Sequence, residues 1–77
     1  MNKSMLDDHM ALRYKIVLMP EEDGWGALIP ELPGCVAGGD TLAEALIMLE
    51  DAKRAWLLSA LSHGDVIPMP DNYDEFS

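Results

Sequence analysis

The sequence has few cysteines, few basic residues and no long apolar run. Cys35 is the one cysteine in 77 residues, which excludes an internal disulfide and indicates a reducing compartment. No segment approaches the roughly 18 consecutive apolar residues of a membrane-spanning helix, and residues 1–8 lack the basic-then-apolar pattern of a secretory signal. We therefore predict a small cytoplasmic protein that does not enter a membrane.

Groupings of catalytic residues are also scarce. His9 and His63 have no neighbours at metal-ligand spacing, and Cys35 has no histidine close by in the sequence. A two-metal nuclease needs several acids converging from strands and a helix, whereas most acids here fall in loops and near the C-terminus. We predict no catalytic residue, no metal site, no cofactor and no enzyme activity. A metal-dependent nuclease remnant is the alternative.

Basic residues are outnumbered: five Lys and Arg stand against 14 Asp and Glu, for a formal net charge of −9. The acids concentrate in residues 20–40 and 63–77, and three are consecutive at Glu21, Glu22 and Asp23. Such a surface repels phosphate backbones and attracts a basic protein, so we predict no direct contact with nucleic acid. The alternative is that the charge serves solubility alone.

Three segments have the alternation of short strands. Residues 10–19 predict the first, with Pro20 ending it, and residues 24–30 predict the second, with Trp25 and Ile29 on the same face. A turn at Pro33-Gly34 leads to a third strand over 35–37, which the glycines at 38–39 are expected to end. Together they predict an antiparallel meander.

One long helix is predicted over residues 42–62. Thr41 and Glu44 have the spacing of a capping box, in which the Thr41 hydroxyl accepts from the Glu44 N–H and the Glu44 carboxylate accepts from the Thr41 N–H. Gly64 is placed to end the helix. The acids at 50–51 and the bases at 53–54 are expected to pair on its surface. The stripe expected to face the sheet is Leu42, Ala45, Leu46, Leu49, Ala52, Trp56 and Ala60.

Three further apolar helix residues, Ile47, Leu58 and Leu61, lie off that stripe. They predict a second contact, most simply a homodimer interface; the alternative is that the C-terminal segment covers Leu58 and Leu61. Residues 66–67 are expected to be extended or to form a last short strand. The predicted organisation is α+β, with a disordered extension (1–9), one domain (10–70) and an acidic tail (71–77).

Several of these segments resemble one known family. The matching runs are Tyr14-Lys15-Ile16-Val17, Gly24-Trp25-Gly26-Ala27, Ile29-Pro30-Glu31-Leu32-Pro33-Gly34-Cys35, and Gly39-Asp40-Thr41-Leu42 followed by Glu44-Ala45. They are similar to the HicB antitoxins, the acidic partners of HicA messenger-RNA interferases, over roughly residues 13–70. The combination of the proline-glycine-cysteine run with the later Gly-Asp-Thr-Leu is the specific part.

The resemblance implies a truncated ribonuclease-H-like fold and a HicA-like toxin as partner, whose active site this chain covers. We expect Glu21, Glu22, Asp23 and Trp25 to contact that toxin, the acids through charge and Trp25 as an aromatic anchor. Trp25 packed inside the fold, against Trp56 or another subunit, is the alternative. Many family members carry a second, DNA-binding domain, which is expected to be lacking after Pro70. An orphan oligomeric binding module is a further alternative.

Overall fold

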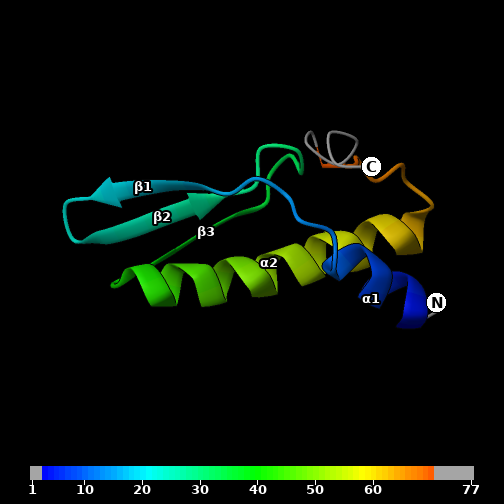
Figure 1. The fold of residues 1–77 in the computed structure, drawn as a ribbon, viewed down its shortest axis with the longest axis horizontal. Helices are drawn as coiled ribbons and strands as arrows, with labels where there is room; N and C mark the ends of the chain where they lie inside the picture. The colour runs from blue at the N-terminus through cyan, green and yellow to red at the C-terminus, as the bar shows by residue number, and fades with distance from the viewer. Residues whose placement is uncertain (1–2, 71–77) are drawn as a thin grey trace.

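The computed structural model describes residues 3–70 as an α+β fold of two layers, a small sheet and a long helix (Figure 1). The elements, in chain order, are α1 (Lys3–Met10), β1 (Val17–Glu21), β2 (Gly24–Leu28), β3 (Val36–Gly39) and α2 (Leu42–His63). The strands lie in the order β1-β2-β3, and both neighbouring pairs are antiparallel. The predicted fold class, a meander followed by one long helix, is confirmed.

The first strand differs from its prediction at both ends. It begins at Val17 rather than at residue 10, and it continues through Pro20 to Glu21, which pairs with Gly24 across a two-residue turn. Because hydrogen-bonded and non-bonded pairs alternate along an antiparallel ladder, closing that turn with Glu21 places the backbone of Pro20 away from β2. The missing N–H of Pro20 therefore costs no bond, as is usual for proline on an edge strand.

The turn between β2 and β3 is built as the sequence predicted. The Cys35 N–H donates to the Leu32 carbonyl at 2.9 Å, and Gly34 has the positive φ, 84°, that the turn requires. The Ile29 N–H donates to the Cys35 carbonyl at 3.1 Å, which extends the pairing of the two strands. Ile29, Leu32 and Cys35 are all buried in the core, so this turn contributes apolar side chains as well as reversing the chain.

Gly38 and Gly39 do not end the third strand, contrary to the prediction; they lie inside β3 and pair with Gly26 and Trp25. The structure shows why a small residue is needed there. A Cβ on Gly39 would lie 2.7 Å from the backbone nitrogen of Ala45 and 2.7 Å from the Cβ of Glu44. The first turn of α2 therefore packs directly on the backbone of β3.

The caps of α2 follow the sequence closely. The Glu44 N–H donates to the Thr41 hydroxyl at 3.1 Å, as predicted, whereas the Glu44 carboxylate accepts from the Asp40 N–H at 2.8 Å rather than from Thr41. At the other end, Gly64 adopts the left-handed conformation, with φ at 69°, and its N–H bonds back to the last turn.

The buried face of α2 is rotated relative to the predicted stripe. Leu42 and Leu46 are exposed and Trp56 is half-buried. The buried residues are Ala45, Leu49, Lys53, Leu57 and Ala60. The cause is a packing contact on a second flank of the helix, because α1 lies beside the C-terminal half of α2 (Figure 1).

Helix α1 occupies the segment that was predicted to be a disordered extension. Its Leu6 is buried, and its end is held by Lys53 of α2, whose Nζ donates to the carbonyls of Met10 at 3.0 Å and Leu12 at 3.2 Å. The same Nζ lies 5.4 Å from the centre of the Tyr14 ring, in cation–π range. Lys53 is thus buried, 8% exposed, where surface pairing with an acid was predicted.

After α2, residues 65–70 form neither helix nor strand, so the possible last strand at 66–67 is not formed. The Tyr14 hydroxyl donates to the Pro68 carbonyl at 2.6 Å and fixes this segment near the entry to β1. The predicted acidic tail, residues 71–77, lies outside the described residues. Within residues 3–70, neither helix is long and apolar enough to cross a bilayer.

Candidate functional site

The residues predicted to contact a partner meet in a hollow at one end of the sheet, which we call the acidic hollow. It is lined by Glu21, Glu22, Asp23, Gly24, Trp25, Gly38, Gly39 and Asp40. The end of β1 and the turn that follows it supply three of the carboxylates, and Asp40 adds a fourth from the residues that precede α2. Sequence reasoning identified the first three as a partner surface and did not include Asp40 in it.

Trp25 lies between the core and the surface. It is half-buried and packs against the core cluster, and it also lines the acidic hollow. An aromatic ring beside carboxylates suits a Lys or Arg side chain, because the carboxylates attract the cation and the ring face can contact it. The four acids and this ring give the hollow the chemistry of a binding site for basic groups.

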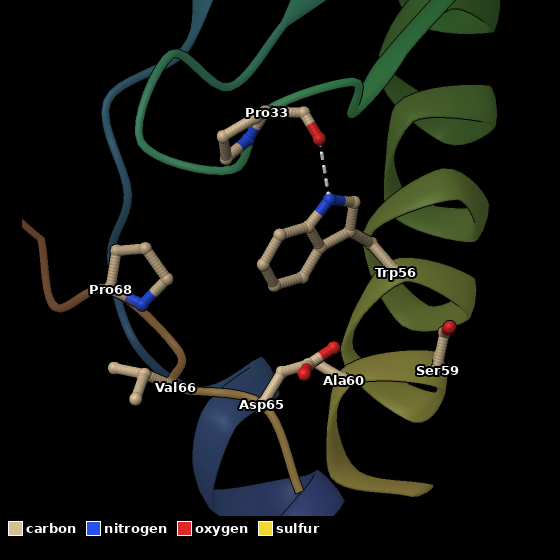
Figure 2. Close-up of a pocket in the computed structure, with 7 residues that line it drawn as sticks. All are labelled: Pro33, Trp56, Ser59, Ala60, Asp65, Val66 and Pro68. Carbon is tan, nitrogen blue, oxygen red and sulfur yellow. Dashed lines mark hydrogen bonds between the residues drawn. The ribbon is translucent and has the colours of Figure 1, made fainter. Parts of the chain in front are cut away.

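A second hollow lies at the far end of α2 and was not anticipated. Pro33, Trp56, Ser59, Ala60, Asp65, Val66 and Pro68 line it (Figure 2). The Trp56 indole N–H donates to the Pro33 carbonyl at 2.7 Å. This bond joins α2 to the turn before β3, so Trp56 has a structural role as well as an exposed edge.

The three residues predicted to form an oligomer interface do not form one uniform apolar patch. Ile47 is 64% exposed, whereas Leu58 and Leu61 are half-buried. Both leucines lie in the half of α2 beside which α1 runs (Figure 1). Contacts within the chain therefore cover part of the helix surface that was predicted to contact a second copy.

Cys35 and Tyr14 are the titratable core groups whose acidity the fold alters. Burial raises the pKa of the Cys35 thiol, an effect that the charge of Lys53 partly offsets. Burial also raises the pKa of the Tyr14 hydroxyl, and the negative charge of Glu31 adds to that shift. A buried thiol with a raised pKa is a poor nucleophile. Among the described residues, no three His, Cys, Asp or Glu side chains gather at metal-binding distance.

The raised pKa of Tyr14 predicts a loss of stability in alkali. Because the folded pKa exceeds the ordinary value of 10.0, the contribution of Tyr14 is complete below about pH 10 and is lost as pH rises through the folded value. Tyr14→Phe should lower the unfolding free energy by about 1 kcal/mol at neutral pH, through loss of the bond to Pro68, and should flatten the alkaline decline. Urea titrations at several pH values up to 11 measure both. An equally steep decline in Tyr14→Phe would contradict the assignment.

Comparison with known proteins agrees with this architecture. The sequence pattern of a family described as the HicB-like antitoxin of bacterial toxin-antitoxin systems matches residues 14–77. The chain belongs to the HicB-like antitoxin family. The match begins at the buried Tyr14 and includes the β2–β3 turn, the acidic hollow and α2, whereas α1 lies before it.

Relatives of similar length and longer ones both occur. UPF0150 protein Ta0767 of Thermoplasma acidophilum is 37% identical over 86% of this chain and 96% of its own length. Antitoxin HicB 2 of Photorhabdus laumondii is 42% identical over 53% of this chain, which corresponds to 30% of that protein. A crystal structure of TTHA0281 from Thermus thermophilus is similar with a TM-score of 0.62 and 37% identity, and the match covers 84% of this chain and 79% of that one.

The family motifs divide into two physical classes. The run from Ile29 to Cys35 forms a turn whose apolar side chains are buried, so it is needed for folding. The segment at Gly24-Trp25, by contrast, lines the acidic hollow. Within this HicB-like protein, Gly24 and Trp25 are therefore partly open to solvent, unlike the buried side chains of Ile29, Leu32 and Cys35.

Proposed function

We propose that this protein neutralises a HicA-type messenger-RNA interferase by binding it and covering its active site. The observation that supports the proposal most directly is the acidic hollow, which combines four carboxylates with the half-buried ring of Trp25. An enzyme that binds RNA presents basic groups to phosphate. The carboxylates of the hollow offer those basic groups another anionic partner. The antitoxin and RNA would therefore compete for the same surface of the toxin.

The direct test first asks whether a short basic protein is encoded beside this chain in its genome, and then uses that protein. Expressed alone, that protein should arrest growth and degrade messenger RNA; co-expressed with this chain, it should do neither. Purified components should give a stable complex in size-exclusion chromatography, together with loss of RNA cleavage. Continued cleavage at saturating antitoxin, with a complex formed, would refute the covering of the active site, and failure to form any complex would refute the partner.

The carboxylates of Glu21, Glu22 and Asp23, which we call the acidic turn, should control the rate at which the protein associates with the toxin. Charges at the rim of an interface act mainly on association and are screened by salt. The triple variant Glu21→Gln, Glu22→Gln, Asp23→Asn should associate about tenfold more slowly at low ionic strength, and its difference from wild type should shrink as salt rises. Stopped-flow kinetics at two salt concentrations measures this. Salt-independent association of both proteins would remove the turn from the mechanism.

Trp25→Ala should change the dissociation rate constant of the complex. Loss of a buried aromatic anchor typically costs about 2 kcal/mol or more of binding energy, which is expressed as faster dissociation. Because Trp25 also packs on the core, a thermal melt must accompany the kinetics. Faster dissociation of the folded variant supports the anchor role. A lowered melting temperature with an unchanged dissociation rate would assign Trp25 to the fold alone.

Self-association through Ile47, Leu58 and Leu61 stays a prediction. Ile47 is exposed enough to contact a second copy, and the half-buried leucines offer less surface. Sedimentation at micromolar concentration should show no dominant monomer if the chain self-associates. The substitution Ile47→Lys then tests whether this face of α2 is responsible.

A further inference from the structure

The hollow at the far end of α2 combines apolar walls with one carboxylate (Figure 2). Pro33, Pro68 and Val66 form apolar walls, Trp56 adds an aromatic ring, and Asp65 adds the carboxylate. The volume of the hollow, about 420 Å³, is within the range of clefts that hold small ligands. Val66 is 90% exposed, so within the described residues its side of the hollow is open to solvent.

Three hydrogen bonds hold the walls of this hollow in place. The Trp56 indole N–H donates to the Pro33 carbonyl at 2.7 Å, which fixes the plane of the ring. The Asp65 N–H donates back to a carbonyl in the last turn of α2 at 2.9 Å, and the Tyr14 hydroxyl donates to the Pro68 carbonyl at 2.6 Å. A site whose walls are fixed beforehand loses little conformational entropy when a ligand enters.

The charge around the hollow suits a cation. The Asp65 carboxylate has no ion-pair partner among residues 3–70, and it follows the last turn of α2, where the helix dipole is negative. The face of the Trp56 ring also attracts cations. Figure 2 shows this ring and the Asp65 carboxylate on the α2 side of the hollow, with Pro68 and Val66 across from them.

Arginine is the side chain that uses all of these features at once. Its planar guanidinium stacks on an indole ring and forms paired hydrogen bonds with a carboxylate. It is also more weakly hydrated than the ammonium of lysine, so less hydration is lost on entry. The apolar stem of the same side chain can contact the proline rings and Val66.

The charge of the chain itself argues against an occupant from within it. Residues 71–77, which follow this hollow in the sequence, contain two Asp, one Glu and no Lys or Arg, so they cannot supply the cation. A second copy carries the same net charge of −9 and is repelled. A basic partner protein has the complementary charge.

We propose that the hollow at the far end of α2 seats an arginine side chain of the toxin, with its guanidinium stacked on Trp56 and bonded to Asp65. The identity of the partner rests on the proposed function. The acidic hollow lies near the other end of α2, roughly 20 Å away by the rise of the helix, which is within the diameter of a small domain. The toxin is thus held at two separate sites.

The first experiment needs no toxin and uses blocked arginine, Nα-acetyl-arginine amide, as the probe. NMR follows the indole N–H resonances of Trp25 and Trp56 in the full chain. The Trp56 resonance should shift saturably, with half-saturation at about 1 mM, and the neutral analogue Nα-acetyl-citrulline amide should leave it in place. Asp65→Asn should weaken the arginine titration at Trp56 at least about fivefold, while the titration at Trp25 stays as in wild type.

The matched control is Asp51→Asn, which removes the same charge from an exposed position of α2 outside both hollows. It should leave the Trp56 titration unchanged, and thermal melts should show that both variants remain folded. No saturable shift at Trp56, an equal shift with citrulline, or equal effects of the two substitutions would overturn the proposal.

Two further measurements identify other occupants. A Trp56 resonance that moves on dilution of the protein from about 500 to 10 μM would indicate a second copy. One that moves on Tyr73→Ala or Phe76→Ala would indicate the C-terminal segment of the same chain. Either result would overturn the proposal.

The last experiment measures toxin binding. Asp65→Asn should raise the dissociation constant of the complex about tenfold, and Asp51→Asn should leave it unchanged. A toxin that binds wild type and Asp65→Asn equally would overturn the second contact and leave the proposed function intact. Absence of any complex would refute the proposed function and with it the partner, and the arginine titration would still decide whether the seat exists.

Discussion

Replacing Lys53 with Ala should lower the unfolding free energy by about 3 kcal/mol. Hydrogen bonds from a charged donor contribute roughly 1.5–3 kcal/mol each, and Lys53 donates to the carbonyls of both Met10 and Leu12. The substitution also removes the cation beside the Tyr14 ring and leaves space where the Lys53 stem was buried. Chemical denaturation measures the loss, and hydrogen exchange should show that α1 becomes exchangeable well before α2.

Two further variants isolate the cause. Lys53→Met keeps most of the stem and removes the charge, so it should retain part of the stability and still loosen α1. Arg54→Ala, an exposed neighbour on the same helix, should change the unfolding free energy by no more than about 0.5 kcal/mol. If Lys53→Met were as stable as wild type, the hydrogen bonds to the end of α1 would contribute nothing net, as can happen when a charge is buried.

Replacing Gly39 with Ala should cost about 2 kcal/mol or more. The added methyl would lie 2.7 Å from the Ala45 nitrogen and from the Glu44 Cβ, and since the former is backbone, the first turn of α2 would have to move. Overpacking of this kind typically costs about 1–3 kcal/mol. The same displacement should disturb the capping bonds of Thr41 and Glu44. A thermal melt measures the loss of stability.

Gly38→Ala is the matched control, because a Cβ there has one close neighbour, the Trp25 carbonyl oxygen at 3.2 Å. It should cost less than about 1 kcal/mol. Equal losses for the two substitutions would show that the strand tolerates no side chain in general, and that the close approach of α2 to Gly39 is not the cause. Gly39 also lines the acidic hollow. Binding of the proposed toxin by the Gly39 variant would therefore also show whether the start of α2 has moved.

The sequence was sufficient to predict the features that depend on residues close together in the chain. Thr41, Glu44 and Gly64 fix the ends of α2 through bonds that span a few residues. Pro33 and Gly34 fix the turn in the same way. The alternation around Ala27 and Ile29 identified the central strand, because the period-2 pattern follows from backbone geometry alone. The acidic turn was also visible, since three consecutive carboxylates cannot be buried together.

The features that the sequence left open depend on contacts between distant segments. Residues 1–9 have no pattern of their own, and α1 is fixed by a lysine 43 residues further along the chain. The same contact rotates the buried face of α2 toward Lys53 and Leu57, which periodicity alone placed outside the stripe. Pro20 and Gly39 were interpreted as strand breakers. A strand accepts Pro20 because its backbone faces away from β2, and Gly39 is needed in β3 because α2 packs closely on it; neither fact is visible in the sequence.

The sequence by itself determined the order of the strands and the long helix, the caps of that helix and the charge of the hollow. Only the tertiary structure decided that Lys53 is a core residue, that Asp40 completes the hollow, and that every residue of β1 is exposed among the described residues. The physical reason is that each of these three features follows from which surfaces meet in space, whereas caps and turns follow from bonds between residues close together in the chain.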